Sequence, residues 1–192
     1  MVIRIPHHAV FPVLVLLLGC PGDDTGGDDG ADDATGAATG MATGVAEDST
    51  GEPAAFDEDE VIARAGMYAT ELVQINEVAF ASQHGLADTV NVFIDQEAAE
   101  LYRSLDPEAP ADVAFPEGTL VVKEHLDAEG AFDGYLLMYR GPDDYEPEGG
   151  NWFWARVDGS LTTQETGAVG FCIGCHQPSP SFLFGVPADN QL

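Results

Sequence analysis

The stretch PEGTLVVKEHL, residues 116–126, gives the clearest local indication of the fold. Its Pro-Glu-Gly start predicts a turn, and the β-branched residues from Thr119 to Leu126 predict a strand. Inside this strand lies Lys123, the only lysine among the 192 residues. One interpretation is an edge-strand lysine that reaches solvent or pairs with Glu124. The other is a buried amine whose lowered pKa makes it a nucleophile.

Strands dominate the middle of the chain, and helices are expected at its ends. Asp57-x-x-Glu60 resembles a capping box, and the apolar spacing that follows predicts a helix. Asp133-Gly134 predicts a tight turn between strands. The pattern therefore indicates an α+β fold over residues 57–192. The remaining expected elements are strands over 89–95, 135–140 and 151–157, a helix over 96–105 and a short helix before Cys172.

A second motif, Cys172-Ile-Gly-Cys175-His176, has the spacing of c-type haem attachment. Two thiols three residues apart can add to the two vinyl groups of one porphyrin, and the adjacent imidazole becomes an axial iron ligand. A zinc site needs about four ligands, and the chain has no second cysteine pair. A redox dithiol of the thioredoxin type is expected to follow a strand in a βαβ unit, whereas this motif lies near the C-terminus.

The third cysteine, Cys20, follows a basic N-terminal region and an apolar run that ends in Leu17-Leu18-Gly19. This pattern predicts a secretory signal over residues 1–19, too short for a spanning helix. Leu-Leu-Gly-Cys also resembles a bacterial lipobox, so we expect Cys20 to be lipidated. The alternative is an ordinary signal peptide with a stray cysteine. Export agrees with the haem prediction, because c-type attachment occurs outside the bacterial cytoplasm.

Composition limits the partners of the chain. The formal net charge is −28 with six Lys plus Arg. Phosphate binding needs a basic surface, which excludes a nucleic-acid partner. Anionic lipid headgroups would also repel the chain, so attachment to a membrane has to come from the lipid on Cys20. Residues 20–56 are rich in Gly, Asp, Ala and Thr, with few large apolar side chains. Such a segment cannot bury enough surface to offset its ordering entropy, so we expect an acidic disordered tether.

Several segments together resemble the cytochrome P460 family. Phe93-Ile94-Asp95 and a helix with Tyr102 are similar to its first strand-helix unit. Phe115-Pro-Glu-Gly-Thr-Leu-Val-Val-Lys-Glu124 is similar to its Phe-x-x-Gly-Thr-x-x-x-Lys-Glu signature. Gly150-Asn-Trp152 resembles one of its strand starts, and the haem motif occupies the family's C-terminal position. The resemblance covers about residues 60–185.

The resemblance implies a β-rich, usually dimeric domain with one haem c. Some members cross-link a lysine to the porphyrin and oxidise hydroxylamine, and Lys123 matches that lysine. Members without the cross-link bind gases in an apolar distal pocket. We therefore expect a lipid-anchored, exported P460-type cytochrome that oxidises hydroxylamine or nitric oxide and passes electrons to a redox partner. The alternatives are a non-catalytic nitric-oxide-binding protein and a plain electron carrier.

The chain departs from the family around the distal pocket. Val90 or Asn91 replaces an arginine, and residues 177–181 lack the acidic residues that commonly follow the haem motif. Active relatives can have a carboxylate in the distal pocket, a few positions before the first haem cysteine. In this chain Glu165 is the candidate for that carboxylate, and Gly167 or Ala168 are the alternative residues at its position. His125 has two interpretations: a residue of the distal pocket, or a partly exposed residue of its strand. Met138 also has two interpretations: a sixth ligand of the haem iron, or a core residue. Trp152 and Trp154 are expected to pack on one face of their strand.

Overall fold

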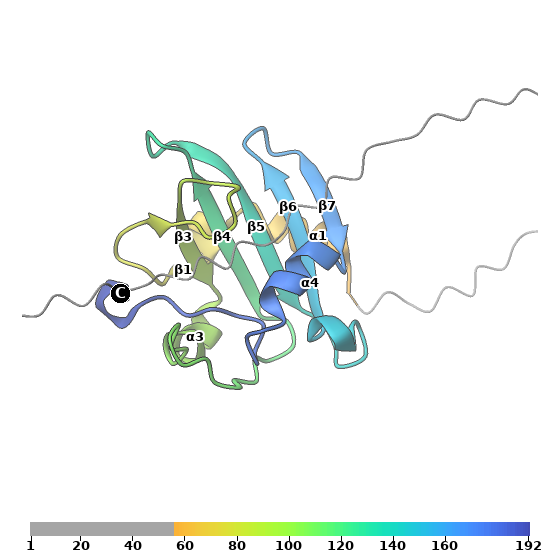
Figure 1. The fold of residues 1–192 in the computed structure, drawn as a ribbon. Coiled ribbons are helices and arrows are strands. Elements are labelled where there is room, and N and C mark those ends of the chain that lie inside the picture. The colour runs from red at the N-terminus through yellow and green to blue at the C-terminus, as the bar shows by residue number, and fades with distance from the viewer. Residues whose placement is uncertain (1–55) are drawn as a thin grey trace, which may run out of the picture. The chain divides into compact units, whose positions relative to one another are not determined.

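The structure, a computed structural model, describes residues 56–192 (Figure 1). The predicted signal sequence, the lipidated Cys20 and the tether up to residue 55 lie outside the described residues. No helix within 56–192 has the length and apolar character needed to cross a bilayer.

One antiparallel sheet of seven strands forms the centre of the domain, in the order β1-β3-β4-β5-β6-β7, with β2 also paired to β3. Short helices accompany it, which confirms the α+β prediction. The strands are β1 (Val73–Gln74), β2 (Phe80–Ala81), β3 (Thr89–Ile94), β4 (Leu120–Leu126), β5 (Phe132–Arg140), β6 (Trp152–Asp158) and β7 (Thr163–Gly167). The α-helices are α1 (Glu58–Ala65), α2 (Tyr68–Glu71), α3 (Ala99–Arg103) and α4 (Gly170–His176).

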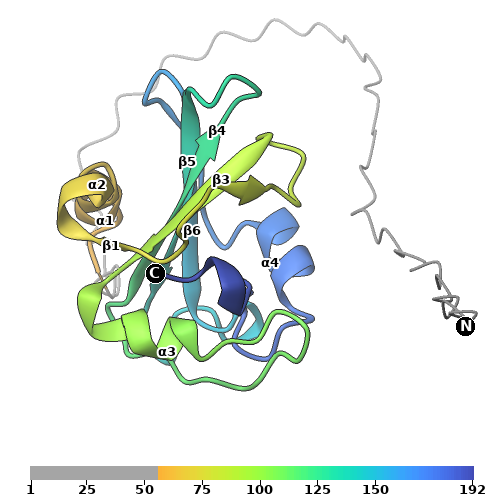
Figure 2. The ribbon, with the colours of Figure 1, turned by 90° about the vertical axis from the view of Figure 1, so that its left-hand side faces the viewer.

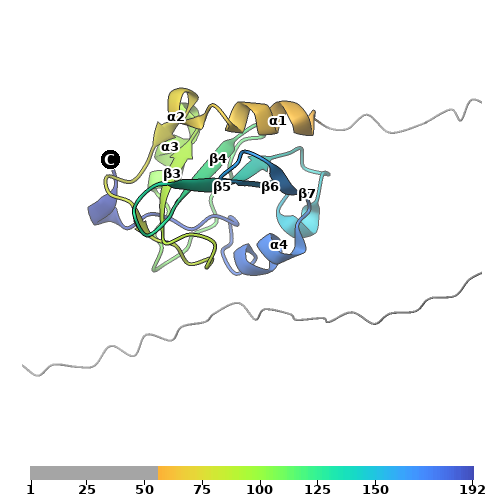
Figure 3. The same cartoon turned by 90° about the horizontal axis from the view of Figure 1, so that it is seen from above.

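The two faces of the sheet bury separate apolar clusters, because successive strand residues point to opposite faces. Helices α1 and α2 cover one face, and α4 lies on the other (Figure 3). Under α1 pack Leu120, Val122 and Phe153. On the α4 side lie Val121 and Trp154, together with other core residues. The α4 face is the one that carries the candidate site.

The first predicted helix exists as two helices. Asp57 caps α1 by accepting a hydrogen bond from the Glu60 amide at 3.1 Å, as the capping pattern predicts. The helix then ends at Ala65, and α2 starts at Tyr68 after Gly66 and Met67. Tyr68 and Leu72 remain buried with Val61 and Ala65, so the predicted apolar face is correct although the helix is interrupted.

The predicted turn at Asp133-Gly134 is wrong, because both residues belong to β5. The chain reverses earlier, where the Gly130 amide donates to the Asp127 carbonyl at 3.0 Å. Gly134 is needed for a different reason. Its φ is +110°, and a Cβ there would lie 2.4 Å from the Val157 carbonyl oxygen. Glycine here permits the close approach of β5 to β6.

Candidate functional site

The haem motif lies on α4, which packs against the sheet beside β6 (Figure 1). Cys172 and His176 are four residues apart, so they lie on the same face of the helix. Cys172 is half-buried and His176 is buried. Because Cys172, Cys175 and His176 all line one cavity between α4 and the sheet, the three residues of the motif face a common space.

Hydrogen bonding fixes the tautomer of His176. Its Nδ1 lies 2.6 Å from the carbonyl oxygen of Phe182, which can only accept, so Nδ1 carries the proton and donates. The other nitrogen, Nε2, then keeps its lone pair for a metal. Burial, followed by the charge of Lys123, lowers the pKa of His176 to about 4. The imidazole is therefore neutral at physiological pH, the form that ligates iron.

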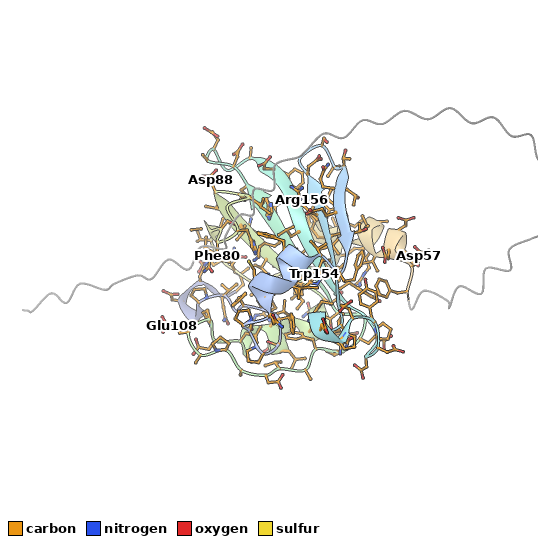
Figure 4. All side chains as sticks on the ribbon, turned by 45° about the vertical axis from the view of Figure 1, so that its right-hand side comes forward. Asp57, Phe80, Asp88, Glu108, Trp154 and Arg156 are labelled. Carbon is orange, nitrogen blue, oxygen red and sulfur yellow. The ribbon has the colours of Figure 1, made fainter. Side chains whose placement is uncertain are left out.

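Aromatic residues surround the His176 ring. Trp154 meets it edge-on with ring centres 4.8 Å apart, and Phe184 does so at 5.3 Å. Such contacts restrict the orientation of the imidazole. Figure 4 labels Trp154 on β6, beside the helix that carries His176. The His176 imidazole is thus held by a hydrogen bond and by ring packing together.

The enclosed part of the cavity is about 50 Å³, and it widens into a mouth that is open to solvent. Its walls are mainly apolar and aromatic, with a few charged or polar groups. Apolar walls suit a porphyrin, whose rings are hydrophobic. The lining residues from the sheet include Val121, Lys123, Leu136, Met138, Trp154, Arg156 and Glu165, and those from elsewhere include His84, Leu86, Tyr102, Phe171 and Phe184.

Four of these residues form one cross-strand row. Lys123 pairs with Leu136, Leu136 with Arg156, and Arg156 with Glu165 across β4, β5, β6 and β7. Residues paired in this way point to the same face of a sheet. The row therefore places an amine, a guanidinium and a carboxylate along one wall of the cavity. Arg156 Nε lies 3.3 Å from Glu165 Oε2.

The surroundings of Lys123 contradict the edge-strand interpretation. Strand β4 lies inside the sheet, between β3 and β5. Glu124 points to the opposite face, where it accepts hydrogen bonds from Tyr68 at 2.5 Å and Asn91 at 2.7 Å. Burial lowers the pKa of Lys123 to about 8, against a small opposing effect of Cys172. At pH 7 roughly one amine in ten is then neutral and nucleophilic.

Unpartnered polar atoms test whether a group such as haem fits this cavity. Among residues 56–192, four buried side-chain nitrogens have no hydrogen-bond partner, and three of them belong to residues that line the cavity. Trp154 Nε1 and Arg156 Nε are N–H donors on the same face of β6. Arg156 Nε is within ion-pair distance of Glu165 but lacks hydrogen-bond geometry to it. Carboxylates such as the propionates of haem would satisfy such donors. The third is Nδ1 of His84. The residues present therefore fit a haem.

The remaining predicted candidates have mixed outcomes. His125 is 3% exposed with its Nε2 unpartnered, so the expectation of a partly exposed strand residue is wrong. It lies on the same face as Lys123 but does not line the cavity.

Met138 is buried in the core, and Trp152 and Trp154 share one face as predicted. Glu165 reaches the cavity wall, and Gly167 follows two residues later at the end of β7.

Comparison with known families agrees with this site. The family model described as Cytochrome P460 matches residues 68–181, which is more than half of the chain and contains Lys123 and the haem motif. The chain belongs to the cytochrome P460 family. No curated protein matches it. Membership in the cytochrome P460 family establishes a haem cytochrome and agrees with the β-rich sheet, whereas the bonds of individual residues to haem stay predictions.

Sequence reasoning missed two residues of the site. Arg156 follows Trp152 and Trp154 at alternating positions of one strand, so its place on the cavity face could have been read from strand periodicity. His84 lies in the loop of residues 82–88 between β2 and β3, where no periodic pattern exists. Its position depends on the packing of that loop against α4, which local sequence does not encode.

Proposed function

We propose that this cytochrome P460 is an exported, lipid-anchored haem c protein that oxidises hydroxylamine or nitric oxide. The observation that supports it most is that Lys123 and the Cys172-x-x-Cys175-His176 motif line the same cavity. A lysine of lowered pKa beside the attachment cysteines is what a porphyrin cross-link requires. Bound haem would supply an iron that accepts a small nitrogen compound and its electrons.

Covalent attachment needs only the chemistry of the motif. The thiol S–H of Cys172 would add across one vinyl C=C bond, forming a C–S bond and placing the hydrogen on the other vinyl carbon. Cys175 would do the same at the second vinyl group. No electrons are gained or lost in either addition. His176, with its proton fixed on Nδ1 by Phe182, offers Nε2 as the axial ligand.

The Lys123 cross-link is an oxidation. An N–C bond to a porphyrin carbon replaces one N–H and one C–H bond, so two electrons and two protons are released to an external two-electron oxidant such as a peroxide. The neutral amine is the reacting form. Its fraction rises because burial lowers the pKa of Lys123 to about 8. An amine with the ordinary pKa of 10.5 would be several hundredfold less available at pH 7.

Turnover needs a proton acceptor and an electron acceptor. Oxidation of hydroxylamine to nitric oxide releases three protons and three electrons. Glu165 on the cavity wall is the candidate acceptor for a proton, and Arg156 Nε lies 3.3 Å from its Oε2. The electrons would pass to a redox partner protein. Lipid on Cys20 would keep the domain at a bacterial membrane, and a homodimer is the assembly we expect.

A second candidate function is non-catalytic binding of nitric oxide. The observation that favours it is the mostly apolar character of the cavity, in which the one carboxylate already pairs with Arg156. A plain electron carrier is the third candidate and predicts that both axial positions of the iron stay filled.

One experiment separates the three candidates. Purified holoprotein is given hydroxylamine with an artificial electron acceptor, and nitric oxide in a separate titration. Turnover together with binding supports the oxidase. Binding without turnover supports the gas-binding protein, and the absence of both supports the electron carrier. Glu165→Gln is the matched variant, since it keeps the shape of the side chain and removes the proton acceptor.

A further inference from the structure

A second histidine, His84, faces the cavity from a separate element. It belongs to the loop of residues 82–88, which is closed by a hydrogen bond from the Ser82 amide to the Asp88 carbonyl at 3.1 Å. This loop and α4 lie on the same side of the sheet (Figures 2 and 3). Figure 4 labels Phe80, which lies in β2 just before the loop, and Asp88, the last residue of the loop. The cavity is therefore lined by imidazoles from two different segments, His84 and His176.

The two imidazoles are close and nearly parallel. Their ring centres are 5.8 Å apart and the ring planes differ by 14°. Direct face-to-face contact would bring them to about 3.5–4.0 Å, so the rings are not in simple contact over their full faces. The Nδ1 of His84 is buried and has no hydrogen-bond partner within residues 56–192. A buried lone pair or N–H without a partner is costly, which indicates that a group absent here completes it.

The spacing decides between two roles. Metal–imidazole bonds are about 2.0–2.1 Å long, the value known for zinc, so two imidazoles on opposite sides of one metal have centres roughly 6 Å apart. A histidine that instead hydrogen-bonds to a metal-bound ligand would lie about 3 Å further away. The observed 5.8 Å agrees with shared coordination. Burial and the neighbouring positive charges lower the pKa of His84 to about 3, so the ring is neutral.

We propose that His84 is an internal sixth ligand of the haem iron, bound opposite His176 in the resting protein and displaced by an incoming ligand. This goes beyond the proposed function, because the sixth position is closed at rest rather than vacant. A small ligand then competes with His84 and binds only after the 82–88 loop moves away. The loop connects the two-residue strand β2 to β3.

The test measures the spin state of the iron. Electron paramagnetic resonance of the ferric holoprotein is expected to show a low-spin, six-coordinate iron. His84→Ala should convert it to a high-spin, five-coordinate iron, and added imidazole should restore the low-spin signal. His125→Ala is the matched control, because His125 is also buried and unpartnered on this side of the sheet but does not line the cavity. It should leave the spin state unchanged.

Ligand kinetics give a second measurement. Nitric oxide binding to the ferrous wild type should approach a limiting rate as ligand concentration rises, because His84 must leave first. In His84→Ala the rate should rise linearly and be at least tenfold faster. A high-spin wild type, or a low-spin signal that survives in His84→Ala, would overturn the proposal. If the proposed oxidase function fails instead, hydroxylamine turnover is absent while these spin-state changes persist.

Discussion

Lys123 and Arg156 lie in one cross-strand row, two strands apart, with Leu136 between them. At the usual strand spacing their Cα atoms are about 9–10 Å apart. They are the two lysine or arginine residues that line the haem cavity of a chain with a net charge of −28. This pair therefore brings positive charge to the cavity wall. The amine can in addition form a covalent bond, which a guanidinium cannot do.

The cross-link can be separated from the charge by two variants. Lys123→Arg keeps the positive charge and removes the nucleophilic amine, whereas Lys123→Ala removes both. Both should lose the altered absorption spectrum and at least 90% of hydroxylamine oxidation while retaining thioether-bound haem and nitric oxide binding. Tryptic mass spectrometry of the wild type should find the Lys123 peptide joined to the haem peptide. An unmodified Lys123 peptide from mature, turnover-competent protein would contradict the cross-link.

We expect haem attachment to depend on the two thiols of α4. Cys172→Ser and Cys175→Ala should each reduce covalent haem strongly, because each variant removes the sulfur for one vinyl group. The measurement is haem-dependent peroxidase staining of a denaturing gel. The double variant should show no stain, with His176→Ala as a comparison that keeps both thioethers. Full staining of the double variant would exclude attachment through this motif.

Membrane attachment is expected to depend on Cys20 alone. Cys20→Ala should move the protein from the membrane fraction to the soluble fraction, because the acidic chain is repelled by anionic lipid headgroups and acyl chains supply the anchoring free energy. Fractionation without detergent measures this, and metabolic labelling with a fatty acid should label the wild type only. Retention of the variant at the membrane would show that another feature anchors the protein.

His125 should make the domain sensitive to acid. Burial, with the charges of Lys123 and Arg156, lowers its pKa to about 4, while Asp133 acts in the opposite direction. The unfolded chain has the ordinary value of 6.5 and binds a proton first. Stability is therefore lost as the pH falls from about 6.5 to 4, by roughly 3 kcal/mol for this group. Denaturant unfolding of the holoprotein at pH 7 and pH 4.5 measures the loss.

The variant His125→Leu isolates this effect. It should flatten the pH dependence of the free energy of unfolding between pH 6.5 and 4.5, since the side chain no longer takes up a proton on unfolding. A slope equal to that of the wild type would assign the acid sensitivity to other groups.

The sequence predicted those parts of the fold whose pattern is local. The strand with Lys123 and the apolar face of the first helix follow from composition, periodicity and capping. The helix with Cys172 was expected as the short segment that carries the haem motif. Strand β7 was not predicted, because Thr163–Gly167 is exposed and polar and lacks alternation. The burial of His125 was missed for a related reason. Whether a strand lies inside a sheet depends on distant pairing, and this also decided the environment of Lys123.

The site was predictable where chemistry imposes a spacing and not where packing alone brings residues together. The haem motif and the lone lysine were visible because covalent attachment requires specific residue types. The Arg156–Glu165 pair and the position of His84 depend on the register of β6 with β7 and on a loop. Neither the Arg156–Glu165 pair nor the position of His84 can be predicted from a local sequence pattern.

The acceptor that holds His176 is a peptide carbonyl, that of Phe182, and a peptide carbonyl does not titrate. A carboxylate in that place would make the imidazole a stronger electron donor. Protonation of the carboxylate would then remove this effect on the imidazole. If His176 ligates the iron as proposed, we expect its electron donation to be constant across the physiological pH range. Any change of redox potential with pH is therefore expected to arise at groups other than this hydrogen bond.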